Sequence, residues 1–172
     1  VSSGKTIVAI LSSAIAVGNN FQVAIMAPTE ILARQHYFSF MDQMDKAKVT
    51  CALLIGNMKK KERTSIISGI KSNKIQIIIG THALIQEDVK FKKLNLVIID
   101  EQHRFGVNQR ASLVAKGENP NFLAMTATPI PRTLSITYNG DMELSIIDEL
   151  PLNRIPITTK VINPDRLKRV YS

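Results

Sequence analysis

Residues Ser3, Gly4, Lys5 and Thr6, near the start of the chain, are of the types that hold phosphate groups. Gly4-Lys5-Thr6 matches the end of the pattern G-x-x-x-x-G-K-[ST], in which backbone N–H groups and the positive end of the following helix bind phosphates. In such a loop Lys5 would reach the β and γ phosphates of a nucleotide, and the Thr6 hydroxyl would ligate Mg²⁺. The tripeptide alone also fits an ordinary helix start with Thr6 near the cap.

A pair of acids, Asp100 and Glu101, directly follows the apolar run 96–99. An acid at the carboxyl end of a buried strand lies where α/β sheets bind their ligands. Asp100 would there hold Mg²⁺, and Glu101 would polarise the water that attacks the γ-phosphate. The alternative is a strand followed by a solvated acidic turn. The presence of both Gly4-Lys5-Thr6 and this acid pair in one chain favours the nucleotide-binding interpretation over coincidence.

Short apolar runs alternate with longer amphipathic stretches, which is typical of an α/β protein with a largely parallel β-sheet flanked by helices. Strands that are apolar at every position are expected to be covered on both faces. The predicted strands are 22–27, 50–55, 75–79, 94–100 and 122–126, and the predicted helices are 5–17, 30–44, 60–72, 108–116 and 131–138. Helical spacing predicts a buried stripe on the first helix, made of Ile7, Ile10, Leu11, Ala14 and Ile15.

The pattern changes around residue 148, where prolines begin to punctuate the chain. We expect residues 1–148 to form one domain. Residues 149–156, which include Pro151 and Pro156, suit a linker, and residues 157–172 suit the start of a second domain.

The bulk composition is basic, with 22 Lys and Arg against 14 Asp and Glu and a formal charge of +8, which attracts polyanions such as nucleic acid. The lysine-rich runs 59–61 and 90–93 fit solvated faces equally well. The single cysteine, Cys51, excludes a disulfide framework and favours a reducing compartment. A helix needs about 20 apolar residues to cross a bilayer, and every apolar run in this sequence is much shorter. We therefore expect a cytoplasmic protein without a membrane segment.

Six sequence blocks together resemble one family of motor proteins. Asp100-Glu101-Gln102-His103-Arg104-Phe105-Gly106-Val107 resembles motif II of superfamily 2 helicases, in the extended form of the RecG family. Ala27-Pro28-Thr29-Glu30 resembles motif Ia, Gly80-Thr81-His82 motif Ib, and Thr126-Ala127-Thr128-Pro129 motif III. Ile130-Pro131-Arg132-Thr133 and Asp148-Glu149-Leu150-Pro151 also match the RecG group, so the resemblance covers essentially the whole chain.

The resemblance implies a RecA-like P-loop NTPase lobe that uses ATP and Mg²⁺, with Lys5, Asp100 and Glu101 as its catalytic residues. The residues implied to grip the DNA backbone, by contacts that position a strand without reading its bases, are Pro28, Thr29, Glu30, Gly80, Thr81 and His82. The residues implied to couple nucleotide state to DNA are Gln102, His103, Thr126, Ala127 and Thr128. The implied substrates are forks and Holliday junctions in DNA recombination and repair, and we expect a monomer.

The RecG family also has parts that fall outside these 172 residues. They are the first glycine of the phosphate loop, a second motor lobe that supplies arginines to the transition state, and an amino-terminal wedge domain that gives the preference for branched DNA. Ser2 stands where RecG proteins commonly have glycine. Because loss of an arginine finger costs on the order of a thousand-fold or more in rate, we expect negligible ATPase activity from this chain alone.

Three alternatives stay open. The motor of the bacterial transcription-repair coupling factor shares the Arg-Phe-Gly-Val block, but it usually reads Glu-Gln where this chain has Gln102-His103. A non-hydrolytic nucleic-acid-binding remnant is indicated if the phosphate loop binds no nucleotide. A small-molecule kinase fits Gly4-Lys5-Thr6 but not the ordered blocks at 27–30 and 126–128.

Overall fold

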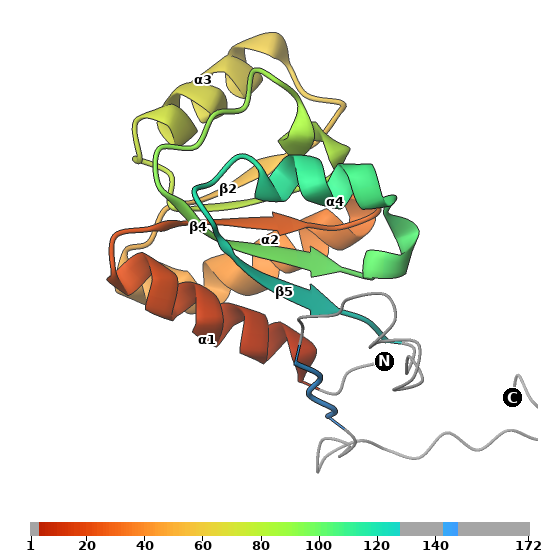
Figure 1. Cartoon of the computed structure of the whole chain (residues 1–172). Helices are drawn as coiled ribbons and strands as arrows, with labels where there is room; N and C mark the ends of the chain where they lie inside the picture. Colours follow the sequence, from red (N-terminus) through yellow and green to blue (C-terminus); the bar gives the residue numbers. More distant parts are fainter. Residues whose placement is uncertain (1–3, 128–142, 148–172) are drawn as a thin grey trace, which may run out of the picture.

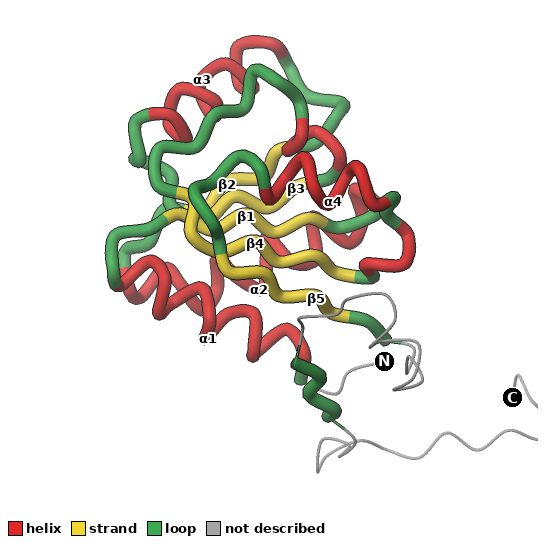
Figure 2. Tube along the Cα trace, viewed as in Figure 1, coloured by secondary structure: helices red, strands yellow, loops and turns green. Residues whose placement is uncertain are grey.

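The computed structural model describes residues 4–127 and 143–147. Its strands form a single five-stranded sheet in the order β2-β3-β1-β4-β5, and every neighbouring pair is parallel (Figure 2). The strands are β1 (Gln22–Met26), β2 (Cys51–Leu54), β3 (Ile77–Gly80), β4 (Leu94–Asp100) and β5 (Asn121–Met125). The predicted α/β fold with a parallel sheet is therefore confirmed.

Helices connect the parallel strands, as crossover connections require. They are α1 (Lys5–Gly18), α2 (Glu30–Met44), α3 (Lys60–Lys71) and α4 (Val107–Val114), with short 3-10 helices η1 (Asp45–Ala47), η2 (His82–Ile85) and η3 (Gln102–Arg104). The predicted helix at 131–138, the linker at 149–156 and the second-domain segment at 157–172 lie outside the described residues. No helix in the described ranges is long and apolar enough to cross a membrane.

The sheet is covered on both faces (Figure 1). Alternate residues of β1 face opposite layers, so Val23 and Ile25 pack with residues of α1 and α2, while Ala24 and Met26 pack with residues of α3 and α4. All five residues of this central strand are buried, which explains why the four residues after Gln22 are apolar without alternation.

The buried face of α1 differs from the predicted stripe. Ile10 is buried as expected, but Ile7, Leu11 and Ile15 are 47%, 58% and 69% exposed, and Ala14 is exposed too. The residues that pack inward are Ala9, Ile10, Ser13, Ala16 and Val17. Ser13 tolerates burial because its hydroxyl donates a 2.7 Å hydrogen bond to the carbonyl of Ala9. The prediction failed because α1 is apolar around most of its circumference, so helical spacing did not distinguish one face from the next.

Candidate nucleotide-binding site

The fold brings the two predicted nucleotide-binding segments to one edge of the sheet. In Figure 1 the amino end of α1, which carries Gly4, Lys5 and Thr6, lies on the side toward which β4 and β5 point. Asp100 is the last residue of β4, so it lies at that same carboxyl edge. α1 also packs on the face of the sheet to which Ile98, two residues before Asp100, contributes. Carboxyl edges of parallel strands are where α/β proteins bind ligands.

Gly4 has the backbone geometry of a tight turn into α1. Its φ of 83° lies in the left-handed region, which glycine adopts without the penalty of a side chain. Its carbonyl oxygen accepts a hydrogen bond from the N–H of Ile7 at 3.0 Å and starts the helix. Lys5 and Thr6 are half-buried in the first turn of α1, and the first turn of a helix favours an anion through its N–H groups and the helix dipole. Ser3 lies outside the described residues.

Asp100 is 9% exposed, and each of its carboxylate oxygens has a protein partner. Oδ1 accepts a hydrogen bond from the backbone N–H of Glu101 at 3.0 Å, and Oδ2 lies 2.8 Å from Nε2 of His36. A carboxylate oxygen accepts more than one hydrogen bond or ligand, so these partners orient the group and leave it able to bind further. These two hydrogen bonds therefore hold the Asp100 carboxylate in one orientation at the edge of the sheet.

Glu101 has a conformation that non-glycine residues rarely adopt. Its φ of 51° and ψ of 50° are left-handed, and it forms the turn between β4 and η3. Its side chain is half-buried, and Oε2 lies 3.5 Å from Nδ1 of the exposed His103. Such backbone geometry clusters at functional sites, where the surrounding structure holds it in place.

The remaining predicted coupling residues are distributed around this turn. Gln102 is buried, and its Oε1 accepts a hydrogen bond from Nη1 of Arg110 on α4 at 3.2 Å. Beyond the end of β5, Thr126 is half-buried and Ala127 is exposed, while Thr128 lies outside the described residues. Gln102 therefore connects the turn after β4 to α4.

The two segments predicted to contact nucleic acid meet beside the nucleotide edge. Thr29 caps α2, with its hydroxyl accepting a hydrogen bond from the N–H of Leu32 at 3.3 Å. A carboxylate oxygen of Glu30 and the ring of His82 both lie within 4 Å of the position that a Cβ atom would occupy at Gly56. Thr29 and His82 are exposed, and Pro28 and Glu30 are half-buried. Residues 28–30 and His82 thus form one accessible surface.

Gly80 and Thr81 belong to the interior instead of this surface. A Cβ atom at Gly80 would lie 2.2 Å from the carbonyl oxygen of Leu54, so glycine is needed for close strand packing. Thr81 is 3% exposed, and its buried hydroxyl has no hydrogen-bond partner among the described residues. The Thr81 hydroxyl is therefore buried beneath the surface formed by residues 28–30 and His82.

Sequence reasoning missed His36 and Arg110. His36 lies 64 positions before Asp100 in the chain, and no local motif relates the two residues. The sequence did contain a sign that His36 is buried, because it lies at helical spacing with the apolar residues Ala33, Phe40 and Met44 of α2. A polar residue in an otherwise apolar buried stripe requires a partner, and that requirement pointed to a polar group in the core.

The donor set at this edge fits a metal–nucleotide complex. Within 4–127 and 143–147, no group of three or more His, Cys, Asp and Glu side chains is arranged to hold a metal by itself. Mg²⁺ is commonly held by one or two carboxylates together with substrate phosphates and water, so a single oriented carboxylate such as Asp100 suits it. The half-buried hydroxyl of Thr6 provides a second oxygen donor of the required kind.

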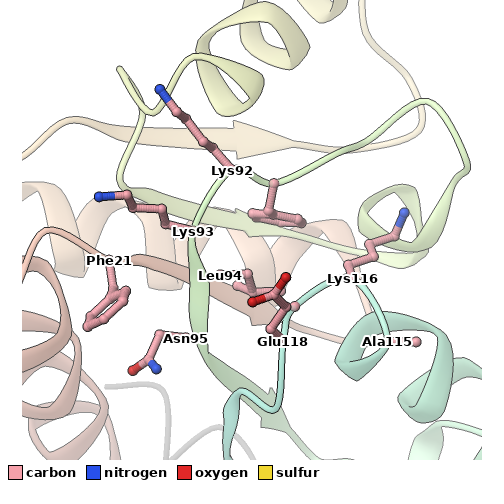
Figure 3. Close-up of a pocket in the computed structure, with 10 residues that line it drawn as sticks. Phe21, Lys92, Lys93, Leu94, Asn95, Ala115, Lys116 and Glu118 are labelled. Atoms are coloured by element: carbon pink, nitrogen blue, oxygen red, sulfur yellow. The ribbon is translucent and has the colours of Figure 1, made fainter.

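A pocket of about 430 Å³ lies at the opposite, amino edge of the sheet (Figure 3). It is lined by Phe21, Leu94 and residues 115–118, among others. The amino groups of Lys92 and Lys93 point outward in Figure 3, and Nζ of Lys116 donates hydrogen bonds to two backbone carbonyls at 2.8 Å. Because these cations do not converge on the pocket, it is not a second phosphate site.

A parallel sheet of this order, with a glycine turn into α1 and an acid pair at one edge, matches the architecture of a RecA-like motor lobe. Residues 1–136 match the family model described as DEAD/DEAH box helicase. The chain belongs to the DEAD/DEAH box helicase family.

Individual relatives narrow the likeness to RecG. The chain is 51% identical over 172 residues to the ATP-dependent DNA helicase RecG of Streptococcus pneumoniae, covering 100% of this chain and 25% of that protein. It is 50% identical over 173 residues to RecG of Aquifex aeolicus, covering 99% and 22%. The solved structure of RecG bound to a three-way DNA junction matches with a TM-score of 0.79 and 45% identity, over 98% of this chain and 22% of that one. The chain resembles the first motor lobe of RecG and spans about a quarter of the length of these relatives.

Proposed function

We propose that this chain is the ATP-binding first motor lobe of a RecG-type DNA helicase, which unwinds or migrates forks and Holliday junctions in recombination and repair. The observation that carries this proposal is the placement of Asp100 and Glu101 at the same sheet edge as Gly4, Lys5 and Thr6. The near 50% identity to RecG proteins supports the DNA-directed activity. Cytoplasmic location and a monomeric state are part of the same proposal.

In this function the residues at the edge have separate tasks. The loop of Ser3 and Gly4 and the first turn of α1 bind phosphates through backbone N–H groups, and Lys5 places a positive charge on the β and γ phosphates. Thr6 and Asp100 hold Mg²⁺, which neutralises charge on the phosphates. Glu101 orients the attacking water and accepts its proton, a role that suits its half-buried carboxylate beside His103.

Nucleic acid is proposed to bind the accessible surface of residues 28–30 and His82. An exposed hydroxyl and imidazole, together with the chain's net charge of +8, favour contact with the sugar-phosphate backbone. The residues proposed to couple the state of the nucleotide to this DNA-binding surface are Gln102, His103, Thr126, Ala127 and Thr128. Gly80 and Thr81 support the surface from beneath, consistent with their burial.

Hydrolysis is proposed to need a second lobe. Residues 1–148 form the first lobe in this view, 149–156 the linker and 157–172 the beginning of the second. Arginines supplied by such a lobe stabilise the transition state and raise the rate of hydrolysis by about a thousand-fold or more. The 172-residue chain alone is therefore expected to bind nucleotide without appreciable turnover.

Calorimetric titration of the chain with Mg²⁺-ADP and with a non-hydrolysable ATP analogue tests the proposal directly. We expect saturable binding that is lost in Lys5→Ala, because the lysine charge faces the phosphates. Lys48→Ala is the matched control, since Lys48 is an exposed lysine at the end of η1. Absence of binding at millimolar nucleotide would favour the non-hydrolytic remnant.

Binding of fluorescent forked DNA tests the nucleic-acid surface. Because contacts to phosphates release counterions, we expect weak binding that falls steeply as salt is raised. His82→Ala combined with Thr29→Ala should weaken binding, whereas the exposed Ser65→Ala on α3 should not. Affinity independent of salt would contradict a backbone-binding mode.

A further inference from the structure

His36 is a buried polar residue on a helix that otherwise packs apolar side chains against the sheet. It is 8% exposed and lies on α2 between the buried residues Ala33 and Phe40. Its Nε2 atom lies 2.8 Å from Oδ2 of Asp100, and this contact joins α2 to the end of β4. None of the motifs in the sequence includes it.

The contact fixes the chemistry of both partners. A carboxylate oxygen accepts hydrogen bonds, so we assign the N–H of His36 to Nε2, which then donates a hydrogen bond to Oδ2 of Asp100. The N–H of Glu101 holds the other oxygen at 3.0 Å, so the carboxylate is restrained at both atoms and cannot rotate freely about its bond to Cβ. Restraint of this kind preorganises a metal ligand and raises its affinity.

Packing alone does not account for a histidine at this position. An apolar side chain would fill the same space in the stripe of Ala33, Phe40 and Met44 without the cost of burying a polar ring. The histidine instead places one N–H against the acid at the sheet edge. Its imidazole therefore serves Asp100 as well as the core.

We infer that His36 is a positioning residue that orients the Asp100 carboxylate toward the Mg²⁺ of a bound nucleotide. This inference rests on the proposed function, because it assumes that Asp100 is a metal ligand. It adds a residue from α2 to a site otherwise built from α1 and the end of β4. Removal of the His36 N–H is expected to weaken metal binding while leaving the phosphate loop unchanged.

Two amide variants that differ by one methylene test the geometry. His36→Gln keeps an N–H donor at a reach similar to Nε2, whereas His36→Asn keeps the same amide but places it too short to reach Asp100. We expect His36→Asn to weaken Mn²⁺ affinity in the ADP complex by about 10- to 100-fold, and His36→Gln to stay within a few-fold of the unmodified chain. Electron paramagnetic resonance of Mn²⁺, titrated into the chain with ADP, measures the affinity.

A control on the same helix separates positioning from packing. Phe40→Leu disturbs the core one turn further along α2 and leaves the hydrogen bond between His36 and Asp100 in place. It should lower the melting temperature but leave Mn²⁺ affinity within about two-fold of the unmodified chain. ADP binding in EDTA should be unchanged in all three variants, because the phosphate loop does not use His36.

The outcomes distinguish the inference from the function on which it rests. If the unmodified chain binds no Mn²⁺-ADP, the proposed nucleotide site fails and the inference fails with it. If the unmodified chain binds Mn²⁺-ADP and His36→Asn binds it equally well, only the inference is overturned. Equal losses of Mn²⁺ affinity in His36→Asn and His36→Gln would also overturn it, because the reach of the donor would then be irrelevant. Equal losses in His36→Asn and Phe40→Leu would overturn it too, because disturbed packing would then explain both.

Discussion

The backbone N–H of Glu101 donates a 3.0 Å hydrogen bond to Oδ1 of Asp100, so the two adjacent acids hold each other in place. This bond accompanies a left-handed backbone at Glu101, a conformation that costs a non-glycine residue roughly 1–2 kcal/mol. The two carboxylates then have separate neighbours. Asp100 lies against His36 on α2, while Glu101 lies beside His103.

This separation predicts different effects for the two acids. In an intact RecG-type helicase, Glu101→Gln should leave binding of a Mg²⁺-ATP analogue within about two-fold, because Asp100 and the phosphate loop are untouched. ATP hydrolysis should fall by about 100-fold or more, since general base catalysis typically contributes that much. Steady-state ATPase assays with forked DNA measure the loss.

Glu118→Gln is the matched control for this experiment. Glu118 is an exposed acid that lines the pocket at the opposite edge of the sheet, so the same substitution there should leave hydrolysis unchanged. Normal turnover in Glu101→Gln would remove Glu101 from the catalytic role.

Sequence alone predicted the elements whose signals are local. β4 begins and ends at the predicted residues because charged side chains bound its apolar run on both sides. α2 also has the predicted bounds, since Thr29 provides a capping hydroxyl before its first residue. The placement of Asp100 at the carboxyl edge followed from the parallel sheet, in which all carboxyl ends share an edge. Gly4 lies at that edge because α1 runs back from it to the amino end of β1.

Features that depend on contacts between distant segments were not predictable. The pairing of His36 with Asp100 requires α2 to lie over the end of β4, which no local pattern specifies. The burial of the Thr81 hydroxyl depends on how η2 follows β3. The choice of buried face on α1 depends on how closely the helix approaches the sheet, and small residues such as Ala9 and Ala16 permit that approach.

Gln22 is predicted to be a major determinant of stability at the amino edge of the sheet. It is fully buried, and its amide donates to the carbonyls of Ile70 and Ile75 and accepts from the N–H groups of Lys92 and Lys93, at 2.8–3.0 Å. Gln22→Met keeps the size of the side chain but leaves these backbone groups unpaired. We expect a loss of roughly 3 kcal/mol in the free energy of unfolding. Urea denaturation followed by circular dichroism measures it.

Asn121→Ala controls for loss of a side-chain amide. Asn121 is exposed, and its amide donates to Asn95 at 3.3 Å, so removal should cost less than about 0.5 kcal/mol. A loss in Gln22→Met no larger than that in Asn121→Ala would show that water satisfies the backbone groups that Gln22 leaves.

Gly80→Ala is expected to destabilise the sheet because its Cβ atom would lie 2.2 Å from the carbonyl oxygen of Leu54. That oxygen is part of the backbone of β2 and cannot move without shifting the strand. We expect a loss of about 2 kcal/mol or more in the free energy of unfolding. Gly18→Ala, where nothing lies within 4 Å of the added atom, should be neutral or slightly stabilising. Equal stabilities for the two variants by urea denaturation would contradict the predicted clash.

The thiol of Cys51 is expected to resist alkylation in the folded chain. Burial disfavours the thiolate and raises the pKa of Cys51 from its ordinary value of 9.0 to about 11. Thiolate is the reactive form, so iodoacetamide at pH 8 should modify the folded chain much more slowly than the chain unfolded in urea. Because Cys51 is the single cysteine, mass spectrometry of the whole chain reports its modification directly.

The raised pKa of Cys51 also makes the stability of the folded chain depend on pH. The folded chain holds the Cys51 proton more tightly than the unfolded chain, so the stabilising contribution is complete below pH 9 and is lost as the pH rises toward 11. Alkylation of the folded chain should therefore accelerate with its midpoint near pH 11, whereas in urea the midpoint should return to about 9. Cys51→Ser removes the thiol and measures the background alkylation of other side chains at each pH. A midpoint near 9 in the folded chain would mean that the thiol is solvated, contrary to its partial burial against the core.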